Sequence, residues 1–118
     1  TGGRYDRLTF DREFSAMARA AGDTVPHTAL SLSEGTSDQL YLALRIAMCL
    51  LLPDSGELCP LILDDALSNF DDARTALALD LLSEIAESRQ VILFTCHSRE
   101  GTYLSGRKNV LIAHPREA

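Results

Sequence analysis

Two short apolar runs, each too brief for a helix and each ending abruptly in polar residues, constrain the fold of this chain more than any other feature. The first run, Leu61–Leu63, stops at the adjacent carboxylates Asp64 and Asp65, and the second, Val91–Thr95, is followed by a cysteine and His97. Buried parallel strands have this pattern, because they are apolar on both faces and end where the sheet meets solvent. The two runs therefore predict neighbouring parallel strands in an α/β fold.

A helix is expected between the two runs, over residues 73–88. Leu77, Leu81 and Ile85 recur there every four residues and predict an apolar face, with acidic side chains on the opposite side. A strand, a helix and a second strand at this spacing are typical of a parallel crossover unit.

The crossover unit is expected to bring Asp64, Asp65 and His97 to the same edge of one sheet. Ligands in open α/β sheets bind beyond the carboxyl ends of the strands. Two adjacent acids at that edge are suited to hold a divalent cation and to orient a water molecule. A strand end with solvated acids and a polar edge histidine is the alternative interpretation of the same residues.

A second candidate site precedes a long apolar helix. Thr36 and Gln39 fit a capping box, so the helix is expected to start at about Ser37. Ser33 and Gly35 would then lie just before its positive end, where free N–H groups and the macrodipole favour a phosphate. Without a Cβ, the glycine lets the backbone approach a ligand closely. An ordinary loop and helix cap is the alternative.

The flanking segments predict further strands. Residues 4–10 and 14–20 suggest a β-hairpin, although their alternation is imperfect. A short strand is expected near residues 28–32, and a last strand at residues 109–113, before Pro115. The expected fold is α/β, with mostly parallel core strands and an antiparallel hairpin at the N-terminal end.

Composition indicates a globular piece of a cytoplasmic protein. An apolar fraction of 46% is ample for the core of one domain. The cysteines Cys49, Cys59 and Cys96 are odd in number and lack Cys-x-x-Cys spacing, which favours reduced thiols. The apolar helix expected at residues 40–52 is too short to span a bilayer and is interrupted by Arg45.

The net charge of −6 is spread unevenly along the chain. Residues 31–96 hold eleven acidic and only three basic side chains. This acidic stretch contains both candidate sites, which is consistent with a site that needs Mg²⁺ to neutralise phosphates. The sequence shows no cluster of Lys and Arg that would indicate a DNA-binding face.

In order and spacing, four segments resemble the C-terminal half of an ABC-type ATPase head of the SMC-like coiled-coil family. Residues 32–36 resemble the signature motif, and residues 61–65 resemble the Walker B strand. Residues 68–71 are similar to the D-loop, and His97 matches the switch histidine. The closest similarity is to the bacterial YhaN-like branch. The resemblance implies one C-terminal ATPase lobe over residues 1–118, with a hairpin region at 1–31 and the motifs and the last strand at 32–118.

The resemblance also implies roles at an ATP–Mg²⁺ site. Within one head, Asp64 would hold Mg²⁺, Asp65 would position or deprotonate the attacking water, and His97 would sense the γ-phosphate. Towards the second head of a homodimer, two pairs of residues would act. The signature residues Ser33 and Gly35 would reach the nucleotide bound by the opposing head. The D-loop residues Ser68 and Asp71 would lie at the dimer interface.

Two residues depart from the family pattern. Glu34 replaces the first glycine of the signature motif and adds a negative charge near the expected γ-phosphate. Asp65 replaces a glutamate, and its side chain is one methylene shorter. Because general-base catalysis depends on hydrogen-bond reach, slow turnover is expected.

The sequence contains no Gly-x-x-x-x-Gly-Lys-Ser/Thr motif, which would cradle the phosphates. The resemblance places that Walker A half at the N-terminus of a longer protein, beyond a coiled coil. The chain alone is therefore expected to be inactive and to need that half as its partner. A nuclease subunit and DNA are further partners that the resemblance suggests, in DNA repair or chromosome maintenance.

Two other readings remain open. The first is an ATP-dependent clamp or interaction module with little or no hydrolysis, weakened by Glu34 and Asp65. The second is a metal-dependent phosphoesterase, whose site would combine four acids with the histidine: Asp64, Asp65, Asp71, Asp72 and His97.

Overall fold

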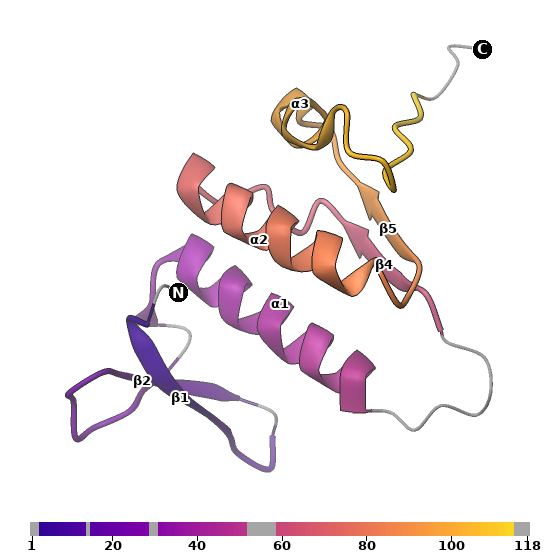
Figure 1. Cartoon of the computed structure of the whole chain (residues 1–118). Helices are drawn as coiled ribbons and strands as arrows, with labels where there is room; N and C mark the ends of the chain where they lie inside the picture. Colours follow the sequence, from indigo (N-terminus) through magenta and orange to yellow (C-terminus); the bar gives the residue numbers. More distant parts are fainter. Residues whose placement is uncertain (1–2, 14, 29–30, 52–58, 115–118) are drawn as a thin grey trace. The chain divides into compact units, whose positions relative to one another are not determined.

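The computed structural model describes residues 3–13, 15–28, 31–51 and 59–114. Along the chain, the elements are β1 (Tyr5–Phe10), β2 (Ala16–Ala20), β3 (His27–Thr28), α1 (Glu34–Leu51), β4 (Leu61–Asp64), α2 (Asp72–Ile85), β5 (Val91–Phe94) and α3 (Ser98–Leu104) (Figure 1). They fall in two compact units, one of residues 1–52 with 69–71, the other of residues 53–68 with 72–118. No helix in the described part of the chain is long and apolar enough to cross a membrane.

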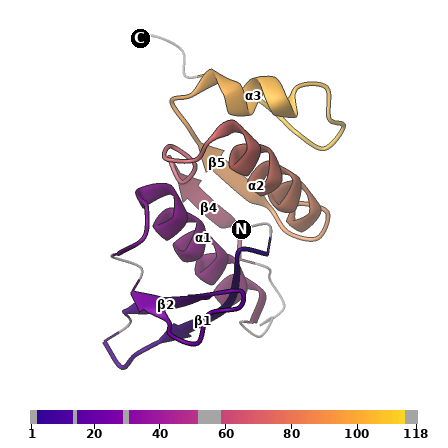
Figure 2. The ribbon, with the colours of Figure 1, turned by 90° about the vertical axis from the view of Figure 1, so that its left-hand side faces the viewer.

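The first unit contains a three-stranded antiparallel sheet in the order β1–β2–β3. Figure 2 shows β1 and β2 side by side. Ala16 and Ala18 alternate along β2 and are buried, whereas the residues between and after them are only partly covered. This alternation fixes which face of the hairpin points inward, because side chains on a strand have a period of two. The predicted hairpin is confirmed, and Phe14, at the start of its second predicted segment, lies outside the described residues.

The strand expected near residues 28–32 begins one residue earlier than predicted, and its described part ends at Thr28. β3 consists of His27 and Thr28, which pair with Ala18 and Met17. Residues 29–30 lie outside the described part. Ser31 already belongs to a turn, since its hydroxyl donates to the carbonyl of Thr28 at 2.7 Å.

Helix α1 starts at Glu34, three residues before the predicted start. The carbonyl oxygen of Ser33 accepts hydrogen bonds from the main-chain N–H groups of Thr36 and Ser37, both at 2.9 Å. Ser33 therefore occupies the position before the first turn that the capping box had assigned to Thr36. The buried large side chains of α1 are Leu40, Leu42 and Ile46.

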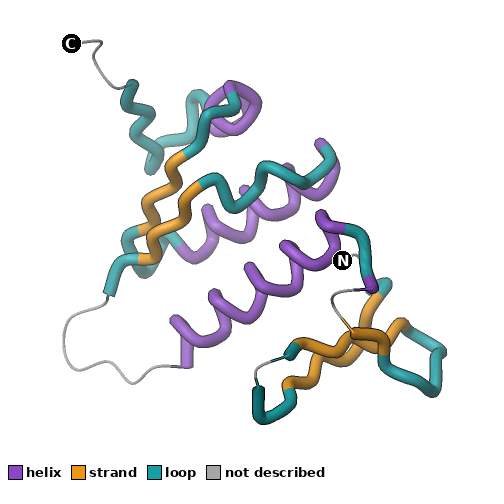
Figure 3. Tube along the Cα trace, turned by 180° about the vertical axis from the view of Figure 1, so that it is seen from behind, coloured by secondary structure: helices purple, strands orange, loops and turns teal. Residues whose placement is uncertain are grey.

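The second unit is built on the parallel pair β4–β5, in which Leu61, Ile62, Leu63 and Asp64 face Val91, Ile92, Leu93 and Phe94 in order. Helix α2 connects the two strands and runs alongside them (Figure 3). The predicted parallel crossover is confirmed.

The expectation that β4 would be covered on both faces is wrong for this structure. Leu61 and Leu63 are 3% and 0% exposed, whereas Ile62 is 52% exposed. Paired residues in a parallel ladder point to the same side of the sheet. The exposed face therefore also carries Phe94, which is 56% exposed.

Of the three residues predicted to form the apolar face of α2, only Ile85 is buried. Leu77 and Leu81 are 59% and 44% exposed, while Leu79 and Leu82 are 1% and 5% exposed. A row of residues four apart drifts around the helix by about 40° at each step, so such a row does not stay on one face. The buried residues instead follow the mixed three- and four-residue spacing of an amphipathic helix: Thr75, Ala78, Leu79, Leu82 and Ile85.

The last predicted strand, at residues 109–113, is not formed. These residues are an irregular loop, in which Leu111 is 92% exposed. Strand β5 pairs with β4 and with no other strand in the described ranges. A β-prone segment becomes a strand only when a neighbouring strand satisfies its main-chain groups, which explains why Asn109–Ala113 stays irregular.

Candidate functional site

The carboxyl end of the β4–β5 pair brings the expected polar residues together. Asp64 is the last residue of β4 and lies opposite Phe94 in the ladder. The ladder continues one step further, because the main-chain N–H of Asp65 donates to the carbonyl of Phe94 at 2.9 Å. The two acids and the segment that leads to His97 therefore share one end of the sheet, as the sequence predicted.

Asp65 leaves the strand through an unusual backbone conformation. Its φ of 44° lies in the left-handed region, and it is the one residue other than glycine with a positive φ in the described ranges. This region is disfavoured for side chains with a Cβ, but Asp tolerates it better than most residues. Residues held in such conformations cluster at functional sites. The conformation turns the chain sharply, and the main-chain N–H of Ser68 donates to the carbonyl of Asp65 at 3.1 Å.

The Asp65 carboxylate reaches across to the segment that follows β5. Its Oδ1 accepts a hydrogen bond from the main-chain N–H of Cys96 at 3.0 Å. The next N–H, that of His97, donates to the hydroxyl of Thr95 at 3.0 Å. These two bonds hold the backbone on either side of position 96. His97 is the N-cap residue of α3, its side chain makes no capping bond, and it is exposed.

Asp64 offers an exposed carboxylate at the strand end. Mg²⁺ commonly binds through one or two carboxylates, keeps several waters and takes further ligands from substrate phosphates. A single accessible carboxylate is compatible with that kind of binding. Within the ranges the structure describes, no group of three or more His, Cys, Asp or Glu side chains is placed to share a metal ion. The phosphoesterase hypothesis requires such a group of ligands.

The second candidate site, at the start of α1, differs from the prediction in one respect. Ser33 precedes the helix and is exposed, and its hydroxyl lies 2.9 Å from that of Thr36. Gly35, however, is inside the first helical turn and is buried. Glu34 is the first helical residue and is exposed, in a position where the helix macrodipole stabilises an acidic side chain. Of the two residues expected just before the helix, Ser33 lies there and Gly35 does not.

The segment 68–71 ends the loop that joins β4 to α2, with one buried apolar residue directly before it and one within it. Leu67 is 2% exposed and Phe70 is 3% exposed. Ser68 and Asp71, the two residues of this segment with predicted roles, are exposed. Within the first unit, the side-chain amide of Asn69 donates to the carboxylate of Asp38 in α1 at 2.8 Å. The segment therefore has anchored apolar residues and accessible polar ones.

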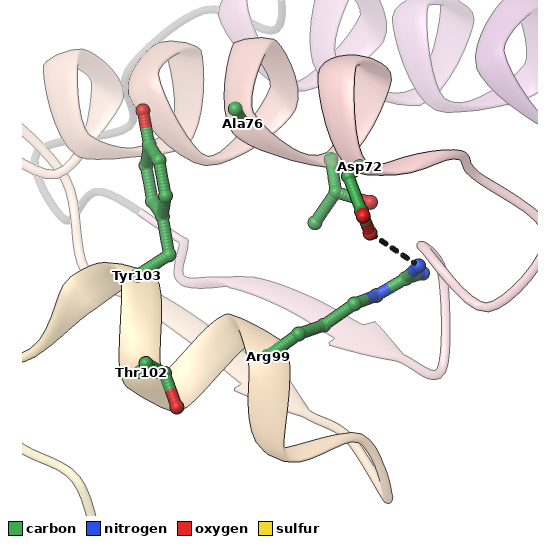
Figure 4. A pocket seen from close by; sticks show the side chains of 6 residues that line it. Asp72, Ala76, Arg99, Thr102 and Tyr103 are labelled. Carbon is green, nitrogen blue, oxygen red and sulfur yellow. Dashed lines mark hydrogen bonds and ion pairs between the residues drawn. The ribbon is translucent and has the colours of Figure 1, made fainter.

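Arg99 is a residue of this region that the sequence did not single out. Its Nη2 donates to the carbonyl of Leu67 at 2.9 Å, and its Nε donates to Oε1 of Glu100 at 3.1 Å. Its Nη1 lies 3.5 Å from Oδ1 of Asp72, the first residue of α2 (Figure 4). Leu67 and Asp72 are 32 and 27 residues away in the sequence, so no local pattern indicates these contacts.

A second set of polar contacts joins α2 to α3. The carboxylate of Asp80 accepts hydrogen bonds from the Tyr103 hydroxyl at 3.1 Å and from Arg107 at 2.7 Å. These bonds, that of Arg107 first, lower the pKa of Asp80 below its ordinary value. Between the two helices lies an open groove of about 420 Å³, lined by Asp72, Thr75, Ala76, Arg99, Thr102 and Tyr103 (Figure 4).

Two known proteins are similar to this chain. No protein-family model matches the chain. The uncharacterized protein YhaN of Bacillus subtilis (strain 168) is 37% identical over 99 residues, which are 82% of this chain. A solved chain from work on ATP-driven dimerization and DNA-stimulated activation of SMC ATPases superposes with a TM-score of 0.64 at 22% identity. The chain is similar to a part of YhaN and has the fold of an SMC ATPase head.

The match to the SMC ATPase head covers 88% of this chain and 68% of that one. It confirms the predicted α/β class, in which an antiparallel hairpin sheet accompanies a parallel strand pair. The chain spans about 10% of the length of YhaN. The similarity to YhaN therefore concerns a small part of a much longer protein.

Proposed function

We propose that this chain is the C-terminal half of an ATP-binding and ATP-hydrolysing head that engages a second head around ATP–Mg²⁺. The observation that carries the proposal is the arrangement at the end of the β4–β5 pair. There, Asp64 and Asp65 leave one strand, and Asp65 is hydrogen-bonded at 3.0 Å to the segment that holds His97. The SMC head fold supports a nucleotide at this end of the sheet.

Each polar residue at this end has a distinct proposed role. Asp64 binds Mg²⁺, directly or through water, and the bound ion would neutralise phosphate charge. Asp65 uses the carboxylate oxygen that is not bonded to Cys96 to orient the attacking water and to accept its proton. His97 donates a hydrogen bond to the γ-phosphate. Because Asp65 holds the backbone beside His97, the water-orienting and phosphate-sensing groups are positioned by one interaction.

Three of the four residues proposed to act on the second head are exposed, and the fourth, Gly35, is buried in the first turn of α1. The exposed hydroxyl of Ser33 and the N–H groups at the start of α1 contribute to the nucleotide site of the opposing head. At Gly35, the absence of a Cβ would let a ligand approach the backbone of this turn closely. Ser68 and Asp71 lie on the exposed side of their segment and contact the partner head.

The proposal requires a Walker A half, supplied by another part of the same longer protein. The sequence itself has no P-loop motif to cradle the phosphates. The β4–β5 pair presents an apolar face with Ile62 and Phe94 more than half exposed. Exposed apolar patches mark surfaces that another structure covers. We propose that the Walker A half covers this face, with a coiled coil between the two halves.

We further propose that the protein is cytoplasmic and acts in DNA repair or chromosome maintenance, with DNA and a nuclease subunit as further partners. The support is the similarity to an SMC ATPase whose activation is DNA-stimulated. The chain itself offers no basic cluster for DNA, so DNA contacts would lie elsewhere in the longer protein.

A specific observation favours a second candidate function, an ATP-dependent clamp with little or no hydrolysis. Asp65 is shorter than the glutamate of the family pattern, and one of its oxygens already accepts the Cys96 N–H. Both features limit its reach towards a water molecule. A clamp would keep ATP-dependent engagement of two heads but would turn over ATP very slowly.

ATP turnover and head engagement should be measured on the complete protein. The proposal expects hydrolysis that is abolished by Asp65→Asn, while ATP-dependent engagement persists. Asp64→Asn should weaken both the Mg²⁺ dependence and engagement. Engagement without measurable hydrolysis in the parent protein would select the clamp. Parent-level hydrolysis in both variants would contradict the assigned roles.

A further inference from the structure

Arg99 connects the helix that follows His97 to both ends of the segment 68–71. At one end, its Nη2 donates to the carbonyl of Leu67 at 2.9 Å. At the other end, its Nη1 lies 3.5 Å from the carboxylate of Asp72. Figure 4 shows the Arg99 side chain extending from α3 towards Asp72 at the start of α2.

The base of the Arg99 side chain is fixed by Glu100. The Arg99 Nε donates to Oε1 of Glu100 at 3.1 Å, and Glu100 is 1% exposed. The second oxygen, Oε2, has no hydrogen-bond partner within the described residues. A buried carboxylate with a single charged partner depends strongly on that partner. The Glu100 contact therefore orients the guanidinium and directs its remaining N–H groups towards the segment 68–71.

We propose that Arg99 is a positioning residue, which makes the placement of the segment 68–71 depend on the position of α3 and so on the position of His97. The inference rests on the proposed function, in which Ser68 and Asp71 contact a second head. A shift of His97 on γ-phosphate binding or loss would be transmitted through α3 and Arg99 to the dimer-facing segment. Both ends of that segment would respond together, since one side chain holds them.

The geometry explains why this position needs arginine. A guanidinium presents five N–H donors in a planar fork and can serve three acceptors at once. A lysine would keep the positive charge beside Glu100 but offers a single ammonium group. Arg99→Lys therefore removes the simultaneous contacts while leaving the buried carboxylate paired.

Arg107 provides a matched control. It is also an arginine close to α3, its side chain is 33% exposed against 32% for Arg99, and it bonds Asp80 and Ser83 of α2. Within the described residues, its hydrogen bonds and its ion pair go to α2 and not to the segment 68–71. Arg107→Lys therefore tests the loss of an arginine fork between the same two helices, without disturbing the ends of that segment.

The experiment uses the complete protein and three readouts. These are steady-state ATP hydrolysis, hydrogen exchange of the amides of residues 66–72, and thermal unfolding. Arg99→Lys should lower kcat about tenfold, because small misplacements of a catalytic assembly are costly, and should leave KM for ATP within about twofold. Exchange in residues 66–72 should accelerate about tenfold with an unchanged midpoint of unfolding. Arg107→Lys should leave kcat and this exchange unchanged.

Equal behaviour of the two lysine variants in kcat and in exchange would overturn the inference. If Arg99→Lys does not fold, the double variant Arg99→Met/Glu100→Gln decides, because it removes the buried charge together with its partner. A folded double variant with slow turnover supports the inference, and one with parent turnover and exchange overturns it. Failure of both to fold would also overturn it, since Arg99 would then serve general stability.

Failure of the proposed function gives a different result. If the parent protein shows no ATP hydrolysis and no ATP-dependent engagement, the proposed function fails. The exchange of residues 66–72 in the lysine variants still tests whether Arg99 positions that segment.

Discussion

The carboxylate of Asp65 accepts a hydrogen bond from the main-chain N–H of Cys96, with 3.0 Å between the two heavy atoms. This bond joins the end of β4 to the segment that begins after β5. Asp65 adopts a left-handed backbone conformation at the same position, with a φ of 44°. The residue proposed to orient water thus also fixes the geometry beside His97, so its two roles need variants that separate them.

Asp65→Asn and Asp65→Ala are expected to separate these roles. The amide oxygen of Asn can still accept the Cys96 N–H, and Asn tolerates the left-handed region, so stability should be close to that of the parent. Alanine loses the acceptor and should lower the free energy of unfolding by about 1 kcal/mol. Denaturant titration of the two variants measures this difference. Equal stability of the two would show that the Cys96 bond contributes little.

The isolated chain is expected to bind ATP–Mg²⁺ negligibly, because its sequence lacks the backbone cradle and the lysine of a P-loop. Calorimetric titration of ATP into a concentrated solution of residues 1–118 tests this expectation. The matched sample is the same chain supplied with its Walker A half, which should bind. A dissociation constant near micromolar for the chain alone would contradict the half-site proposal.

The sequence predicted the crossover unit and its polar end because the signals are local. Each apolar run ends in its own polar residues, and parallel pairing then brings the two ends together without further information. The hairpin was predictable for the same reason. The start of α1 was predicted three residues too late, because Ser33 as well as Thr36 carries a hydroxyl group suited to a cap, and the structure begins the helix after Ser33.

Other features depend on contacts that no local pattern records. The bonds of Arg99 to Leu67 and Asp72 join residues about thirty positions apart. The strand expected at residues 109–113 needed a neighbouring strand, which the described part of the chain does not provide. The buried face of α2 was misassigned, because the leucines occur on more than one side of the helix and packing decides which side is covered.

Leu79→Ala and Leu77→Ala test the corrected face of α2. Leu79 is 1% exposed, and its truncation should lower the free energy of unfolding by about 2–5 kcal/mol through lost burial and a new cavity. Leu77 is 59% exposed, and its truncation should change stability by no more than about 0.5 kcal/mol. Chemical denaturation of both variants measures the contrast. A larger loss of stability for Leu77→Ala than for Leu79→Ala would show that the face with Leu77 is the buried one.

The contacts of Asp80 predict a pH-dependent contribution to stability. Hydrogen bonds from Arg107 and Tyr103 lower the pKa of Asp80, so the folded state binds its proton less readily than the unfolded state does. The contribution is therefore present above the unfolded pKa of about 4 and is lost as the pH falls through the lower, folded pKa. Asp80→Asn should be less stable than the parent at pH 7, and this difference should shrink below about pH 4. Thermal unfolding of both proteins across this pH range provides the measurement, with Glu84→Gln as an exposed control on the same helix. A difference that stays constant down to about pH 2 would show that the Asp80 charge is not what stabilises the α2–α3 contact.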